Sequence, residues 1–106
     1  MEPITRNDSL KEMWNNNKAF VLLKHSLTCP ISASAKDEVT SFEDSSDIPV
    51  YIVPIQEARD VSREVERQLD IKHESPQAFF IKDGNVVWHG THFDITAKAL
   101  ADATSE

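Results

Sequence analysis

The sequence of 106 residues has a single cysteine, Cys29, and this scarcity rules out several kinds of site. One thiol cannot form an intramolecular disulfide, so we expect the chain to work in a reducing compartment. Structural zinc sites usually need several cysteine or histidine ligands, and the pair His89 and His92 is too small a set. We therefore predict no metal site and no tightly bound cofactor.

Positive charge and long apolar runs are also scarce. Eleven Lys and Arg residues stand against 18 Asp and Glu, which gives a formal net charge of −7. Nucleic-acid-binding proteins usually carry a basic cluster, and none is present. No segment approaches the roughly 20 apolar residues that cross a bilayer, and residues 1–6 lack the apolar core of a signal peptide. We expect a cytoplasmic protein without nucleic-acid or membrane partners, and its oligomeric state stays open.

What is present is the pattern of one α/β domain over residues 1–106, a length that suits a single modest core. The continuous apolar run at 20–23 is typical of a strand buried on both faces. Residues 50–53 predict a second strand because they are mostly β-branched or aromatic. Between these two runs, apolar residues spaced by three or four positions over 31–42 predict a helix.

The remaining elements complete the expected topology. Helices are predicted around residues 10–14, from about 58 to 69, and after a cap at Asp94 or Thr96. Asp83-Gly84 is a hairpin signal between two short apolar strands, which must be antiparallel. The earlier strand–helix–strand unit must be parallel and right-handed. We therefore predict a four-stranded mixed sheet with helices on both faces.

Cys29 stands where a strand is predicted to end and a helix to begin. Pro30 suits the first turn of a helix, where its missing N–H would have had no partner. Free N–H groups and the helix dipole stabilise an anion at that end, so we expect a Cys29 pKa below the free value of about 8.5. Lys24, at the strand end, would add to this effect if its ammonium faced the sulfur. The alternative is a buried, inert thiol.

Two short segments carry the most specific pattern in the chain. The first is Thr28-Cys29-Pro30-Ile31-Ser32, preceded by Lys24-His25-Ser26. The second is Lys72-His73-Glu74-Ser75-Pro76-Gln77-Ala78-Phe79. Together they resemble the monothiol bacilliredoxins, a branch of the thioredoxin-like superfamily, and the resemblance extends from about residue 4 to 101. It implies a thioredoxin-like fold, in which a cis proline at position 76 would face the cysteine.

The resemblance also implies an activity. Members of this family are thought to act on mixed disulfides between proteins and bacillithiol, a thiol built from cysteine, glucosamine and malate. Cys29 would then be the nucleophile, bacillithiol the co-substrate, and bacillithiolated proteins the partners. Other residues implied to contact the bound substrate come from both motifs: Thr28, Pro30, Ile31, Ser32, Ser75, Pro76 and Lys24.

The chain departs from dithiol thioredoxins at two positions. Ser32 replaces the second cysteine, so an external thiol must release Cys29 from a mixed disulfide. Leu23 and its neighbour Leu22 occupy the region where many thioredoxins place a buried acid. His25 is a candidate for proton transfer, against a purely structural role. Lys24 and Lys72 are candidates for contact with the malate carboxylates, against the alternative of ordinary exposed lysines.

Two other functions stay open at this point. Cys-Pro-Ile-Ser is similar in layout to the Cys-Gly-Phe-Ser of monothiol glutaredoxins, which can bridge an iron–sulfur cluster across a dimer. Pro30 in place of that glycine would hinder the close approach of two chains. The third possibility is a thioredoxin-like binding module without catalysis, in which Cys29 is incidental and keeps the pKa of a free cysteine.

Overall fold

The apolar run of the sequence becomes the central strand of a sheet. In the computed structural model, which describes residues 1–105, this strand is β2 (Ala19–His25). It pairs in parallel with β3 (Val50–Pro54) and antiparallel with β4 (Gln77–Lys82). Burial of β2 on both faces explains why its sequence shows no alternation of apolar and polar residues.

The hairpin after β4 is confirmed. Asp83 and Gly84 have φ values of 55° and 81°, so both central turn residues adopt the left-handed backbone of the turn that Asp-Gly favours. The chain then returns as β5 (Asn85–Thr91), which is antiparallel to β4. This strand is longer than its apolar core suggests and reaches the end of the sheet where β2 also ends.

The expectation of four strands is wrong, because the sheet has five in the order β1-β3-β2-β4-β5. The additional strand is β1 (Glu2–Pro3), which pairs in parallel with β3. The N–H of Ile4 continues this pairing by donating to the carbonyl of Ile52 at 2.8 Å. A strand of two residues has no pattern to detect, since its pairing depends on the free edge of β3.

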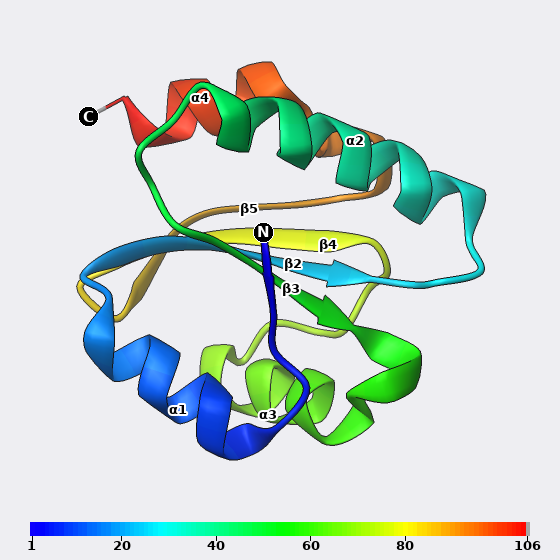
Figure 1. The fold of residues 1–106 in the computed structure, drawn as a ribbon, viewed down its shortest axis with the longest axis vertical. Helices are drawn as coiled ribbons and strands as arrows, with labels where there is room; N and C mark the ends of the chain where they lie inside the picture. The colour runs from blue at the N-terminus through cyan, green and yellow to red at the C-terminus, as the bar shows by residue number, and fades with distance from the viewer. Residues whose placement is uncertain (106) are drawn as a thin grey trace.

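Helices cover both faces of the sheet, as expected (Figure 1). One face carries α1 (Asn7–Asn16) and α3 (Arg59–Leu69), and the other carries α2 (Pro30–Asp44) and α4 (Ala97–Thr104). Two 3₁₀ turns, η1 (Ile55–Glu57) and η2 (His92–Asp94), follow β3 and β5. Of the two candidate caps of α4, Thr96 is the one used, because its hydroxyl accepts from the N–H of Ala99 at 3.0 Å. No helix in the described part of the chain is long and apolar enough to span a membrane.

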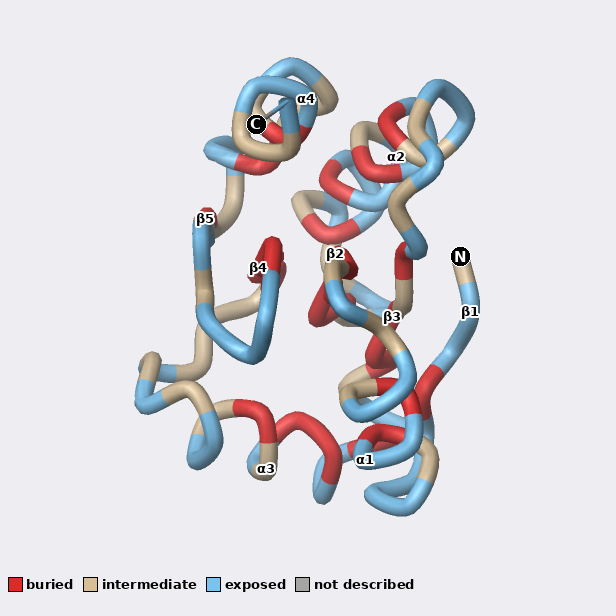
Figure 2. The backbone as a smooth tube through the Cα atoms, turned by 90° about the vertical axis from the view of Figure 1, so that its left-hand side faces the viewer, coloured by how far each residue is buried: buried red, intermediate tan, exposed pale blue. Residues whose placement is uncertain are grey.

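Alternation along β2 divides the core into two clusters. Phe20 and Leu22 pack on the side of α1 and α3, whereas Val21 and Leu23 pack on the side of α2 and α4. Buried backbone accordingly concentrates on the strands and on the inner sides of the helices (Figure 2). Lys24 follows Leu22 in this alternation, and this places its side chain on the α3 side of the sheet.

Candidate active site

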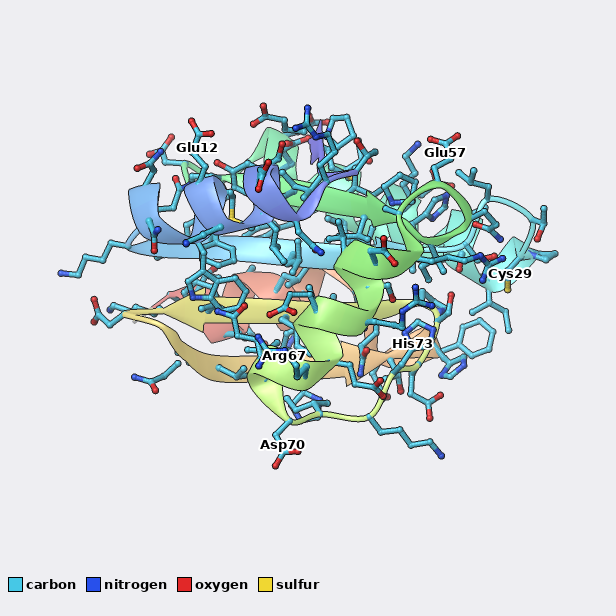
Figure 3. The ribbon with its side chains drawn as sticks, turned by 90° about the horizontal axis from the view of Figure 1, so that it is seen from below. Glu12, Cys29, Glu57, Arg67, Asp70 and His73 are labelled. Carbon is cyan, nitrogen blue, oxygen red and sulfur yellow. The ribbon has the colours of Figure 1, made fainter. Side chains whose placement is uncertain are left out.

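Cys29 is the residue immediately before α2, and Pro30 is the first residue of that helix, as the sequence predicts. The thiol is partly exposed at the end of the sheet (Figure 3). Backbone N–H groups of Ser32 and Ile31 donate to the sulfur and lower the Cys29 pKa from its ordinary value. Partial burial raises this pKa by less than either N–H group lowers it, and the Ser32 hydroxyl adds a smaller lowering effect. The arrangement favours the thiolate, which is the nucleophilic form.

Ser32 connects the thiol to the loop that precedes it. Its side chain is fully buried, and its Oγ accepts a hydrogen bond from the N–H of Ser26 at 3.2 Å. Thr28 and Pro30 are exposed on either side of Cys29, and Ile31 is half-buried. The motif therefore has one residue anchored in the interior, while its other members surround the sulfur at the surface.

The second motif forms the loop that leads into β4. The Ser75–Pro76 peptide bond is cis, which agrees with the proline geometry that the resemblance implied. Lys24 pairs with Gln77 across β2 and β4, so Pro76 lies at the end of β2 from which the Cys29 loop departs. The carbonyl of Pro76 accepts from the N–H of His92 at 3.0 Å. The two motifs, far apart in the sequence, thus meet at one end of the sheet.

Lys24 is neither an ordinary exposed lysine nor a group that acts on the thiol. Its side chain is fully buried, and its Nζ lies 3.2 Å from Nδ1 of His73. Burial lowers the pKa of Lys24 to about 8, partly offset by the charge of Glu66. The groups that shift the Cys29 pKa do not include this ammonium. The condition set for Lys24, an ammonium that faces the sulfur, is therefore not met, since this ammonium faces His73.

The α2 side of the sheet contains no carboxylate at the position where many thioredoxins have one. Leu23 is fully buried there in the apolar cluster. His25 is 7% exposed, and its Nδ1 has no hydrogen-bond partner among residues 1–105. Burial lowers its pKa, as does the nearby charge of Lys36, against a raising contact with the Ser32 backbone. His25 is therefore a neutral, buried imidazole at pH 7.

Gln56 is a residue of the site that the sequence did not reveal. It lies in η1, and its Oε1 accepts from the N–H of Leu27 at 2.9 Å. Its Nε2 donates to Oγ of Ser26 at 2.9 Å and to Oγ1 of Thr28 at 3.5 Å. This one side chain holds all three residues that precede Cys29. A usable signal existed, because parallel strands end at the same edge of a sheet and Gln56 follows β3 as the loop follows β2.

Comparison with known proteins places this geometry in a family. The model of the family described as monothiol bacilliredoxin BrxC matches residues 2–100. The chain belongs to the monothiol bacilliredoxin family. A solved structure described as "a putative oxidoreductase with a thioredoxin fold" is 38% identical to this bacilliredoxin, with a TM-score of 0.92. That match covers 96% of this chain and 91% of the other.

More distant structures establish the fold alone. Thioredoxin from Fasciola hepatica has a TM-score of 0.79 at 16% identity, covering 99% of this bacilliredoxin and 97% of that chain. Mitochondrial thioredoxin 3 from Saccharomyces cerevisiae, in its oxidised form, has a TM-score of 0.78 at 15% identity, covering 99% and 93%. The bacilliredoxin is thus a thioredoxin-like α/β protein, and its family makes it a thiol oxidoreductase.

Proposed function

We propose that this bacilliredoxin removes bacillithiol from protein mixed disulfides by a mechanism that uses Cys29 alone. The observation that carries the proposal is the position of the chain's one thiol. It is partly exposed at the start of α2, and two backbone N–H groups lower its pKa. Such a thiol can attack a disulfide but has no second cysteine in the chain to resolve the product.

The proposed reaction has two exchanges. In the first, the Cys29 thiolate attacks the bacillithiol sulfur of the modified protein. The disulfide bond between the protein sulfur and the bacillithiol sulfur breaks, its electron pair leaves with the protein thiolate, and that thiolate takes a proton from solvent. In the second, the thiolate of another bacillithiol molecule or of a partner protein attacks the bacillithiol sulfur now bonded to Cys29. A new disulfide forms, and Cys29 returns as a thiolate.

The other motif residues have roles in this proposal that follow from their positions. Ser32 and the backbone of Ile31 hold the negative charge of the leaving and attacking sulfur. Thr28, Pro30 and Ile31 form the surface around the sulfur that a substrate must contact. Ser75 and Pro76 lie at the same end of the sheet, where a disulfide bound to Cys29 would meet them. We propose no tightly bound cofactor and place the reaction in the cytoplasm, where thiols stay reduced.

A transfer assay tests the proposal. The purified chain is mixed with a bacillithiolated protein, quenched with acid and examined by intact-mass spectrometry. We expect bacillithiol to appear on Cys29 while the target regains its free thiol. Cys29→Ser should prevent the transfer, and Ser34→Ala, an exposed change in the same helix, should leave it intact. A chain that takes up no bacillithiol, with a Cys29 pKa like that of free cysteine, would instead be the binding module considered above.

A further inference from the structure

A cavity with a volume of about 160 Å³ opens beside α3, on the side of the sheet away from α2. Its lining comes from η1, α3 and the loop before β4: Ile55, Arg59, Ser62, Arg63, Glu66 and His73. One water molecule takes a share of about 30 Å³ in the liquid, so the cavity has room for a larger group. Figure 3 shows that His73 and Cys29 lie at the same end of the molecule.

A buried cation behind this cavity is poorly satisfied. The ammonium of Lys24 has three N–H donors, but His73 Nδ1 is its one hydrogen-bond partner among residues 1–105. The Ser62 hydroxyl lies 3.3 Å from the same nitrogen, and a neutral imidazole nitrogen accepts one hydrogen bond. Ser62 is 5% exposed and Lys24 fully buried, so neither group can turn to bulk water. Unfilled buried donors of this kind favour an added acceptor.

The charges around the cavity point to the nature of that acceptor. Arg59 is exposed and forms no ion pair with any residue that the structure describes, while Arg63 pairs with Asp60 at 2.5 Å. The one carboxylate in the lining is Glu66, which accepts from the N–H of His73 at 2.7 Å. With Arg63 paired to Asp60 and Glu66 set against the buried Lys24, Arg59 is the cation of the cavity lining that has no carboxylate partner among the described residues, in a chain whose net charge is −7. The unpaired guanidinium of Arg59 favours an anion as the added acceptor.

The walls of the cavity are connected to the thiol. Ile55 precedes Gln56, whose side chain binds the three residues before Cys29. His73 belongs to the loop that ends at Pro76, and Lys24 lies on the strand that leads to the Cys29 loop. The segments that line the cavity therefore adjoin those that position Cys29, at one end of the molecule.

We infer that this cavity binds a carboxylate of the substrate that Cys29 attacks, with the exposed Arg59 and Arg63 and the buried Ser62 in its walls and Lys24 behind His73. The inference rests on the proposed function, since it assigns a recognition site to the same reaction. The carboxylate has two sources, the malate part of bacillithiol or an acidic side chain of the protein that carries it. The chemistry of the contact is the same for both sources, and the experiment separates them.

The first arm measures binding without any redox step. L-Malate is titrated into the 15N-labelled chain, and the amide signals of Ser62, Glu66 and His73 are followed by NMR. We expect saturable shifts that Arg59→Gln weakens at least about tenfold, because hydrogen bonds to charged groups are the stronger class. Arg67→Gln is the matched control, since Arg67 lies on the same helix, pairs with Glu64 and is outside the cavity.

The second arm measures exchange at Cys29 with three substrates: bacillithiol disulfide, a bacillithiolated protein and uncharged hydroxyethyl disulfide. Arg59→Gln should slow the two bacillithiol substrates about tenfold and leave the uncharged disulfide unchanged. Slowing confined to the protein substrate assigns the carboxylate to the partner protein. The inference is overturned if malate shifts none of these amides and Arg59→Gln matches Arg67→Gln on every substrate. Failure of the proposed function is a separate result: the wild-type chain takes up no bacillithiol, whether or not malate binds to it.

Discussion

The two sides of the sheet differ sharply at the end where the thiol lies. The α2 side is apolar apart from His25 and Ser32, and Leu23 occupies the position of an internal acid. The α3 side carries a buried lysine, a histidine and a serine in mutual contact. On the first side, the backbone N–H groups of Ser32 and Ile31, together with the Ser32 hydroxyl, stabilise the thiolate without any charged side chain. In the inference above, the thiol and the site that recognises the substrate lie on opposite sides of one strand.

The largest expected effect comes from breaking the apolar side. Phe42→Ala removes a ring that is 2% exposed against β2, and we expect it to lower the free energy of unfolding by about 3–5 kcal/mol. Urea denaturation measures the change. Phe93→Ala is the control, because that ring is 73% exposed and its loss should change stability by less than about 0.5 kcal/mol. Equal losses in the two variants would contradict the assignment of the core.

The next prediction concerns the α3 side, where we expect a substitution to raise the free energy of unfolding instead of lowering it. Lys24→Met removes a buried cation whose pKa has fallen from 10.5 to about 8, a shift that corresponds to roughly 3 kcal/mol. The variant also loses the hydrogen bond to His73, which offsets part of this energy. We therefore expect the free energy of unfolding to rise by roughly 1–3 kcal/mol at pH 7. Denaturant unfolding of both proteins measures it.

The stability difference between Lys24→Met and the wild type should depend on pH. Between pH 8 and 10.5 the unfolded chain keeps a proton on Lys24 that the folded chain has lost, so wild-type stability rises with pH relative to Lys24→Met. The stability gain of Lys24→Met should be full below pH 8 and should be lost as the pH rises towards 10.5. Lys72→Met, at an exposed position, should show no such trend. A difference that stays constant from pH 7 to 10.5 would show that Lys24 is not the buried cation described here.

A smaller effect is expected at the thiol itself. Ser32→Ala removes a hydroxyl that lowers the Cys29 pKa, so this pKa should rise and alkylation at neutral pH should slow. The Ser26 N–H also loses its acceptor, at a cost of about 1 kcal/mol in stability. The pH profile of iodoacetamide labelling gives the pKa, with Ser34→Ala as the exposed control in the same helix. An unchanged profile would mean that backbone N–H groups act alone.

The smallest effect concerns the loop between the two sides. Gln56→Ala removes hydrogen bonds at exposed positions, so the stability loss should be below about 1 kcal/mol. Amide exchange at Leu27 should nevertheless become faster, because its N–H loses the Gln56 acceptor. Gln68→Ala, an exposed change on α3, should leave that exchange rate alone. Protection of Leu27 that survives Gln56→Ala would show that other contacts hold the loop.

The elements that the sequence predicts well are those with strong local signals. Cys29-Pro30 marks the start of α2, Asp83-Gly84 marks the hairpin, and both are where expected. Strand β1 was missed because its pairing comes entirely from β3. The sequence does not predict the burial of Lys24, because the apolar run 20–23 ends before this residue. Strand β2 continues to His25, so Lys24 points to the same face of the sheet as Phe20 and Leu22, the face covered by α1 and α3.

The position of Cys29 at the very start of α2 has a consequence for the lifetime of any intermediate. The N–H groups of Ile31 and Ser32 interact most strongly with a sulfur that bears a full negative charge. A sulfur in a covalent bond to a ligand has no such charge, so these donors favour its departure over its retention. A mixed disulfide on Cys29 should therefore be short-lived, because Cys29 leaves readily as a thiolate when another thiolate attacks the attached group.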